Sequence, residues 1–307
     1  MSDTAMLDEA DACHDDDPAA AAGLLRALDA AALPPERWPG LAFLFNHVLG
    51  EKLMAWPEAH AKQQSLLALA GATPPAALLR QAAVAAALAG DTPAAEGLCA
   101  GLAASTGAPL QQARDVVTLT ATMYRAPGLP AQEAAEDVLN ALLTVQGEPW
   151  QSANALDTAA AACLNNIASA LLERPRADLQ HGALRAALDS AAQSSERLWR
   201  RAGTWVHHER AAYLRAMVAT ALGEPHRARH HALRALALLD QHDSANAESV
   251  DRAFIELEHA HACERLGLAD EARAAQATAQ ALADAFGDAG LSAWFDKRRA
   301  ELATKPR

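Results

Sequence analysis

Aromatic residues are scarce in this chain: phenylalanine, tyrosine and tryptophan together make up 4% of its 307 residues, although 51% are hydrophobic. Much of the apolar content is therefore alanine, which favours helix and lets helices approach each other closely. The β-branched and aromatic residues that favour strands never alternate with polar ones over a useful length. The sequence predicts an all-α protein.

Long apolar runs are also missing. None approaches the ~20 residues that a membrane-spanning helix requires, and no basic region followed by an apolar one indicates a secretory signal. Cysteine is rare and unpaired in sequence, without a CxxC motif; the four are Cys13, Cys99, Cys163 and Cys263. We expect free thiols in a reducing, cytoplasmic environment and no membrane contact.

The net charge of −12 is unevenly distributed. Residues 1–17 carry acidic side chains but no Lys or Arg, which predicts a disordered acidic tail. Residues 174–234 hold eleven arginines against five acids. Two interpretations of the tail are open: a solvated segment that aids solubility, or an autoinhibitory one that covers the arginine-rich segment until a partner displaces it.

One spacing recurs at the joints between alanine- and leucine-rich stretches. It comprises Gly90-Asp91 with Ala95, Gly223-Glu224 with Ala228, and Gly267 with Ala272. Glycine suits the position just past a helix end, and proline the first turn of the next helix. After a short helix at 18–32, the predicted helices are 41–55, 57–70, 75–89, 93–106, 109–126, 130–146, 150–173, 177–202, 205–222, 225–241, 246–266, 269–286 and 290–302. Such short breaks make neighbouring helices antiparallel.

These joints, together with Ala235-Leu236 after the second of them and the segment 164–168 (LNNIA), resemble the tetratricopeptide repeat (TPR) family. The resemblance covers residues 41–287. It implies an all-α, right-handed superhelix, or solenoid, of about six antiparallel helical hairpins. We expect N-terminal hairpin repeats at 18–147, and TPR-like repeats with a capping helix at 148–307.

The same resemblance indicates a candidate binding groove. In TPR proteins the first helices line the concave face, where asparagine amides bind the backbone of an extended peptide. This places Asn165 and Ser169 on the groove and Asn166 at its edge. Arg80, Arg210 and Tyr213 fall at comparable points of other repeats. The alternative is that all six are ordinary surface or helix-cap residues.

Histidines concentrate between residues 207 and 261. His226 and His230 are spaced i, i+4 on one predicted helix, and Glu256, His259 and Cys263 are spaced i, i+3, i+7 on the next, so a zinc site that uses these histidines and Cys263 is one hypothesis. The alternative interpretation makes His259 and Cys263 core residues and the other two solvated ones. No nucleotide-binding, metalloprotease or nucleophile-elbow motif is present. We therefore predict no catalytic residue, cofactor or metal.

The sequence favours a non-enzymatic protein–protein interaction or scaffold module that binds a peptide or a partner's helix. A ligand-responsive regulator, taking a short peptide or small molecule, is the alternative, and a metal-dependent enzyme is a third hypothesis. An acidic chain argues against nucleic-acid binding, because neutralising phosphates requires a basic face. The sequence indicates neither the partner nor the oligomeric state.

Overall fold

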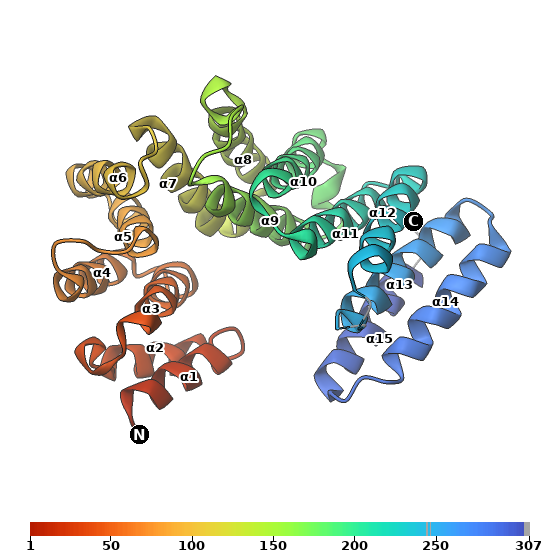
Figure 1. Cartoon of the computed structure of the whole chain (residues 1–307), viewed down its shortest axis with the longest axis horizontal. Helices are drawn as coiled ribbons and strands as arrows, with labels where there is room; N and C mark the ends of the chain where they lie inside the picture. The colour runs from red at the N-terminus through yellow and green to blue at the C-terminus, as the bar shows by residue number, and fades with distance from the viewer. Residues whose placement is uncertain (244, 246, 304–307) are drawn as a thin grey trace. The chain divides into compact units, whose positions relative to one another are not determined.

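The computed structural model describes residues 1–243, 245 and 247–303, and within these ranges every regular element is helical (Figure 1). This confirms the predicted all-α class. The longer elements are α1 (Asp3–Cys13), α2 (Pro18–Ala27), α3 (Trp38–Leu44), the π-helix η3 (Phe45–Lys52), α4 (Trp56–Ala70), α5 (Ala76–Leu88), α6 (Thr92–Thr106), α7 (Leu110–Arg125), α8 (Ala131–Gln146), α9 (Asp157–Leu172), α10 (Gly182–Ala202), α11 (Trp205–Ala221), α12 (Pro225–His242), α13 (Ser249–Arg265), α14 (Ala269–Ala283) and α15 (Ala289–Ala303).

Most predicted helices agree with these bounds to within a few residues, but the predicted helix 150–173 begins only at Asp157. The Trp150 indole is buried and donates a hydrogen bond to the Asp115 carboxylate over 2.9 Å. This contact keeps the segment before Asp157 from continuing the helix α9 toward residue 150. Asn154 then donates its backbone N–H and its amide to the Asp157 carboxylate. These contacts replace the missing first turns of the helix.

The first residues are not the disordered tail that their composition predicts. They form α1, which buries Leu7 and Ala10 at i, i+3 spacing. Among its acidic side chains, Asp8 forms an ion pair with Arg37. A narrow apolar stripe is therefore sufficient to fold an acidic segment, because its charges lie on the solvent side and have local partners. The partners are not those that the autoinhibitory hypothesis requires, since Arg37 lies outside residues 174–234.

The recurring spacing has the same structure at all three joints. Gly90, Gly223 and Gly267 have φ of 85°, 75° and 76°, a left-handed conformation that strains any residue with a β-carbon. The N–H of the next residue then donates to the carbonyl five positions earlier, over 2.9 Å each time. This is the Schellman end of a helix. It turns the chain so that Ala95, Ala228 and Ala272 are buried in the following helices.

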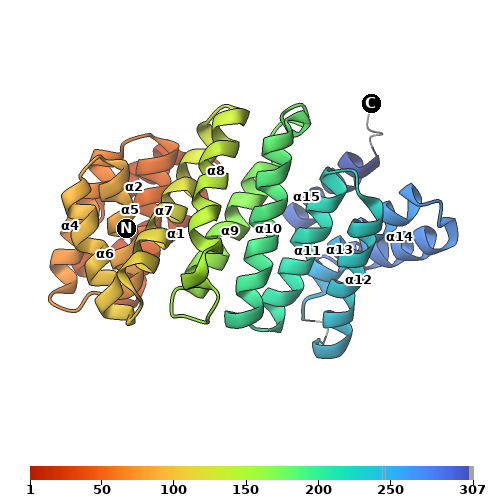
Figure 2. The same cartoon turned by 90° about the horizontal axis from the view of Figure 1, so that it is seen from above.

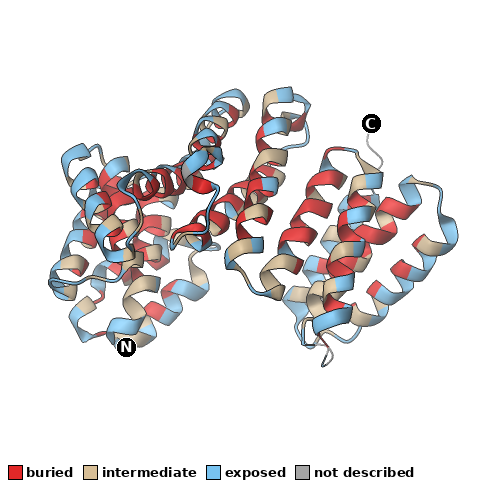
Figure 3. Ribbon diagram, turned by 45° about the horizontal axis from the view of Figure 1, so that its top comes forward, coloured by how far each residue is buried: buried red, intermediate tan, exposed pale blue. Residues whose placement is uncertain are grey.

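Helices adjacent in sequence pack against each other, as in α4–α5–α6 and α10–α11–α12–α13–α14 (Figures 1 and 2). Alternate helices also touch: α5 contacts α7, α11 contacts α13, and α13 contacts α15. Buried residues form bands along the helices while exposed ones cover the outer sides and many turns (Figure 3). Alanine contributes much of this core, notably where Ala212 and Ala216 of α11 meet Ala232 and Ala235 of α12.

The contacts divide the chain into two compact units. The first comprises residues 1–129 and 140–160, and the second comprises 130–139 and 161–307. The division predicted at 147/148 therefore falls inside a segment of the first unit. The helices α8 and α9 each contribute residues to both units, which the spacing of glycine and proline did not indicate.

In the first unit, α3 continues into a π-helix rather than the predicted α-helix over 41–55. The Leu53 N–H donates to the Val48 carbonyl, five residues earlier. Gly50 faces the Trp56 ring so closely that a β-carbon would overlap it. The wider π turn and the missing side chain together let Trp56 pack against η3.

Candidate functional site

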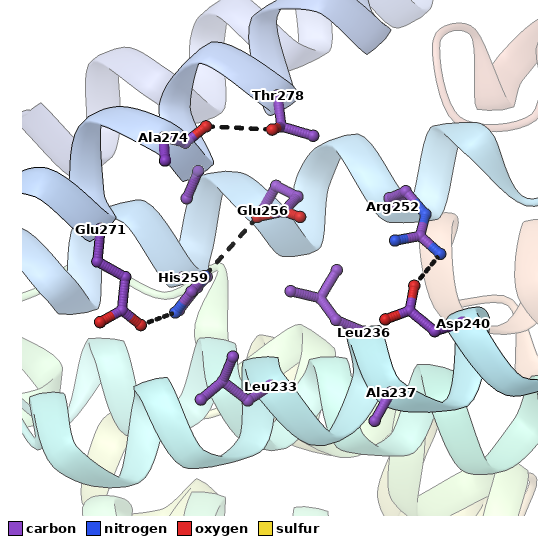
Figure 4. Close-up of a pocket in the computed structure, with 11 residues that line it drawn as sticks. Leu233, Leu236, Ala237, Asp240, Arg252, Glu256, His259, Glu271, Ala274 and Thr278 are labelled. Atoms are coloured by element: carbon purple, nitrogen blue, oxygen red, sulfur yellow. Dashed lines mark hydrogen bonds and ion pairs between the residues drawn. The ribbon is translucent and has the colours of Figure 1, made fainter.

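A pocket of about 350 Å³ in the second unit is lined by α12, α13 and α14 (Figure 4). We call it the α12–α14 pocket. Its volume falls in the range of small-ligand and side-chain sites, roughly 300–1,000 Å³. The lining residues are Leu233, Leu236, Ala237, Asp240, Arg252, Glu256, His259, Glu271, Ala274, Ala275 and Thr278.

Helical periodicity assembles this lining. On α12 and on α14 the residues stand at i, i+3, i+4 and i+7, so each set occupies a single helix face. On α13, Arg252, Glu256 and His259 do the same at i, i+4 and i+7. The space itself depends on small residues, since Ala237, Ala274 and Ala275 stand where longer side chains would fill it.

Charged groups lie at both ends of the pocket and leucines lie between them (Figure 4). At one end, Arg252 donates to the Asp240 carboxylate over 2.7 Å. At the other, His259 and Glu271 are joined by a 3.0 Å hydrogen bond. Three carboxylates but one guanidinium line the pocket, so its electrostatic character is acidic.

His259 has one ring nitrogen without a partner. Its Nε2 lies 3.0 Å from a Glu271 oxygen, and because a carboxylate only accepts, this nitrogen carries the proton. Its Nδ1 is buried and has no hydrogen-bond partner in the described structure. The nearest charged atom is a Glu256 oxygen at 3.7 Å, beyond hydrogen-bond distance.

Glu256 is half-buried, with its side chain 14% exposed, and the described contact of its carboxylate is the 3.7 Å approach to His259. A carboxylate with so little access to water gains free energy from a donor or a cation that reaches it. The α12–α14 pocket therefore presents an acceptor carboxylate and an unpaired imidazole nitrogen beside an apolar floor.

Of the four residues in the zinc hypothesis, the structure brings together two. His259 and Cys263 lie with Glu271, and their ligand atoms are within 4.8 Å of one another. Arg229 reaches the same place, donating Nε and Nη2 to one Glu271 oxygen over 3.0 and 2.6 Å. The hydrogen bonds from Arg229 and His259 hold the pKa of Glu271 below its usual value. Burial raises the pKa of the Cys263 thiol. The Arg229 guanidinium thus already neutralises the Glu271 carboxylate. Cys263 is held as a protonated thiol, which is a poorer metal ligand than a thiolate.

His226 and His230 belong to no such cluster in the described residues. Both are exposed on α12, and the ring of His230 contacts that of His231 instead. The alternative interpretation, that these two are solvated and that His259 and Cys263 are buried, agrees with this arrangement.

The predicted groove residues lie on other helices. Asn165 and Ser169 are half-buried on α9 and Asn166 is exposed there. Arg80 is on α5 in the first unit, where its guanidinium lies 3.5 Å from the Thr120 hydroxyl. Their role as groove residues stays a prediction.

Arg210 and Tyr213 lie one turn apart on α11. The Arg210 guanidinium donates to Asp251 and Glu248 over 2.8 and 3.1 Å. Tyr213 packs against two hydrophobic clusters, and burial raises the pKa of its phenol. Their side chains thus contribute to packing and ion pairing between α11 and α13.

Sequence reasoning missed the lining of the α12–α14 pocket apart from Glu256 and His259. The signal was the i, i+3, i+4, i+7 set repeated on 233–240 and 271–278, both of which follow a glycine joint. In a chain this rich in alanine, however, such sets occur on nearly every helix. What distinguishes these two is the contact each makes with α13, which only the structure supplies.

No protein-family model matches this chain, and no curated protein matches it. No helix in the described ranges combines the length and the apolar character needed to cross a membrane. All four cysteines are described and form no disulfide, as the sequence predicts.

Proposed function

We propose that this protein is a non-enzymatic helical-repeat module that binds a segment of another protein in the α12–α14 pocket. The observation that carries the proposal is the buried His259 Nδ1, which has no hydrogen-bond partner among the described residues, next to the half-buried Glu256 carboxylate and an apolar floor. A partner segment would place a leucine-sized side chain on Leu233 and Leu236 and a neighbouring Lys or Arg near Glu256. Acidic lining and basic partner are complementary in charge.

The repeat architecture supports this proposal. We infer that the hairpins stack as in TPR proteins, because the three glycine joints share one geometry and alternate helices touch. In that arrangement α11 and α13 are first helices, while α12 and α14 are second helices. The proposed site therefore takes α12 and α14 from the second helices and only α13 from the first helices, whereas the groove that the sequence predicts is lined by first helices.

Selection of peptides tests the proposal. A random 12-residue peptide library is selected on the wild-type protein and counter-selected on Ala274→Leu, whose added side chain fills the pocket. We expect enriched peptides with an aliphatic anchor beside Lys or Arg, and a loss of affinity of at least about tenfold in Ala274→Leu. Glu256→Gln should weaken the same peptides by about fivefold.

Two matched controls keep the result specific. Ala277→Leu adds the same side chain to an exposed position of α14 outside the pocket, and Glu264→Gln removes an exposed carboxylate from α13. Neither should change affinity. Peptides that bind the wild type and Ala274→Leu equally would move the interface away from this pocket, and a failure to enrich any peptide would contradict the proposal.

The pocket volume also favours a second candidate, a ligand-responsive regulator that binds a small organic amine. A thermal-shift screen with diamines and polyamines distinguishes the two, because a ligand that binds only the folded state raises its Tm. A shift that Ala274→Leu abolishes and Ala277→Leu retains would support the regulator.

A further inference from the structure

A second group of metal-ligating side chains lies in the first unit, where the end of α1 meets the π-helix η3. His14 and Asp15 follow α1 directly, and His47 comes from η3. The His14 Nε2 is 3.4 Å from one Asp15 oxygen, and the His47 Nε2 is 3.5 Å from the other. The three ligand atoms lie within 4.8 Å of one another.

Hydrogen bonds on the far side of each ring define which nitrogen is available. The His14 Nδ1 lies against the Asp11 carbonyl, and the His47 Nδ1 lies 2.7 Å from a Glu51 carboxylate oxygen. A carbonyl and a carboxylate only accept, so both Nδ1 atoms carry protons. In the neutral imidazole each Nε2 then carries a lone pair and faces Asp15.

A cation between these atoms would bind both lone pairs and the carboxylate, whereas without one a proton on the His47 Nε2 makes its 3.5 Å contact with Asp15 a hydrogen bond. The geometry is that of a metal site, in which a ligating histidine donates its other N–H to a carboxylate or a carbonyl. Bonds of about 2.0–2.1 Å in a tetrahedral zinc site place neighbouring ligand atoms about 3.4 Å apart. Each histidine Nε2 lies at about that spacing from an Asp15 oxygen, His14 at 3.4 Å from one oxygen and His47 at 3.5 Å from the other.

The surroundings orient the rings and leave one side open. Phe43 stacks on His47 with ring centroids 5.3 Å apart, and His14 meets His47 edge to face at 5.1 Å. Both histidine side chains are largely buried, 21% and 15% exposed, whereas Asp15 is 67% exposed. A hydrated ion could therefore approach from the Asp15 side.

One competing cation is present. The Lys52 ammonium lies 3.0 Å from the Asp15 oxygen that also faces His47. Unlike Arg229 in the His259 cluster, it holds one carboxylate oxygen through a single contact, and its side chain is one-third exposed. It neutralises Asp15 in part but contacts neither imidazole nitrogen.

We propose that His14, Asp15 and His47 bind a divalent transition-metal ion of the zinc class, with Glu51 and the Asp11 carbonyl as outer-shell partners. Two imidazoles and a carboxylate leave at least one position for water or another donor. The ion would join the end of α1 to η3. This proposal is independent of the α12–α14 pocket, and either can fail without the other.

The test is a titration of chelator-treated, full-length protein with Co²⁺, followed by its visible absorption, and with Zn²⁺ in competition with a chromophoric chelator. We expect one equivalent to bind tightly, and the variant His14→Gln/His47→Gln to lose at least about 100-fold in affinity. All measurements use a His226→Gln/His230→Gln background, which removes the exposed i, i+4 pair on α12.

Two further variants keep the ligands and move the affinity in opposite directions. Glu51→Gln should weaken binding by about tenfold, and Lys52→Met should strengthen it by about fivefold because the competing cation is gone. Circular dichroism confirms that each variant is folded. No binding by the wild type, or equal binding by the wild type and the double histidine variant, would overturn the proposal, as would the absence of opposite shifts in the two single variants.

Discussion

The two units bury polar groups of different kinds in similar alanine- and leucine-rich helices. In the first unit one buried network consists of neutral amides: Asn46 donates to the Gln81 backbone and side chain over 2.8 and 2.7 Å, and Gln63 donates to Asn46 over 2.9 Å. All three side chains are buried. This network ties η3, α4 and α5 together without any full charge.

In the second unit most of the buried polar groups are ionisable. Glu196, 9% exposed, lies 2.7 Å from both Arg200 and Arg234 and 3.7 Å from Arg215, which is 6% exposed. Burial opposes ionisation of Glu196, but the neighbouring guanidinium groups outweigh it and hold its pKa below the usual value. The arginine-rich segment is therefore largely a set of internal ion pairs between α10, α11 and α12.

The buried amides and the buried ions should respond differently to a change of pH and to the removal of one partner. Amides do not titrate, so the first network is insensitive to pH, whereas each buried ion depends on the protonation of its partner. Removing one member of a buried ion pair also costs more than removing one member of an amide network, because a charge remains in a medium of low dielectric. Three substitutions test this comparison.

Glu196→Ala should have the largest effect. It leaves Arg215 buried with Asp189 as its remaining carboxylate partner, and we expect a loss of about 3–5 kcal/mol in urea unfolding. Hydrogen exchange should accelerate in α10–α12. The exposed pair Asp270–Arg273 supplies the control, since Asp270→Ala should cost less than about 1 kcal/mol. Equal losses in the two variants would remove the distinction between buried and exposed pairs.

Asn46→Ala should have an intermediate effect. It leaves the Gln81 carbonyl groups without this donor, and we expect a loss of about 2–3 kcal/mol that is the same at pH 5 and pH 8. Urea unfolding at both values measures it. Gln64→Ala changes an exposed amide on the same helix as Gln63 and should be nearly neutral. A loss that depends on pH would show that a titrating group, rather than the amides, dominates this region.

Glu209→Gln should have the smallest effect and a characteristic pH dependence. Burial, and then the nearby Asp251 carboxylate, raise the pKa of Glu209 to about 8, and neither of its oxygens has a hydrogen-bond partner in the described residues. The folded state thus binds a proton that the unfolded state releases near pH 4.5, so stability falls as pH rises from there to 8. Between pH 6.5 and 8 the fall should be about 1–2 kcal/mol.

Thermal unfolding across this pH range measures the slope. Glu209→Gln should flatten it, because a neutral amide fills the same space without titrating. His231 does not interfere above pH 6.5: burial lowers its pKa to about 4, so its contribution is lost only as pH falls below the value of the unfolded state. An unchanged slope in Glu209→Gln would show that Glu209 is ionised in the folded protein.

Much of the helical framework could be predicted because its signals are local. A glycine past a helix end, an acidic or leucine cap and a buried alanine four positions later encode the joints at 90, 223 and 267 without reference to distant residues. Where prediction failed, a long-range contact decided the outcome. Trp150 is held by Asp115, and α1 is stabilised because its apolar stripe is buried against neighbouring helices. A short stretch of sequence reveals neither contact.

The pockets and clusters were harder to predict for the same reason. The zinc hypothesis identified His259 and Cys263 on one helix face, but Arg229 and Glu271 come from two other helices and determine what the cluster does. Likewise, nothing in the spacing of His14 and His47 indicates that they meet. Periodicity assigns a residue to a face, whereas the packing of helices decides which faces share a site.

The π-helix η3 makes the contacts at the end of α1 depend on the number of residues in η3. Because its hydrogen bonds span one residue more than those of an α-helix, η3 is equivalent to an α-helix with a one-residue insertion. Deleting Val48 would let the helix return to α geometry, and each of the next residues would then take the helical position of the residue before it. Lys52 would then stand four positions after His47. That is the position from which the Glu51 carboxylate now accepts a hydrogen bond from the His47 Nδ1. A single deletion would exchange an acceptor for a donor beside the imidazole without altering any side chain of the cluster.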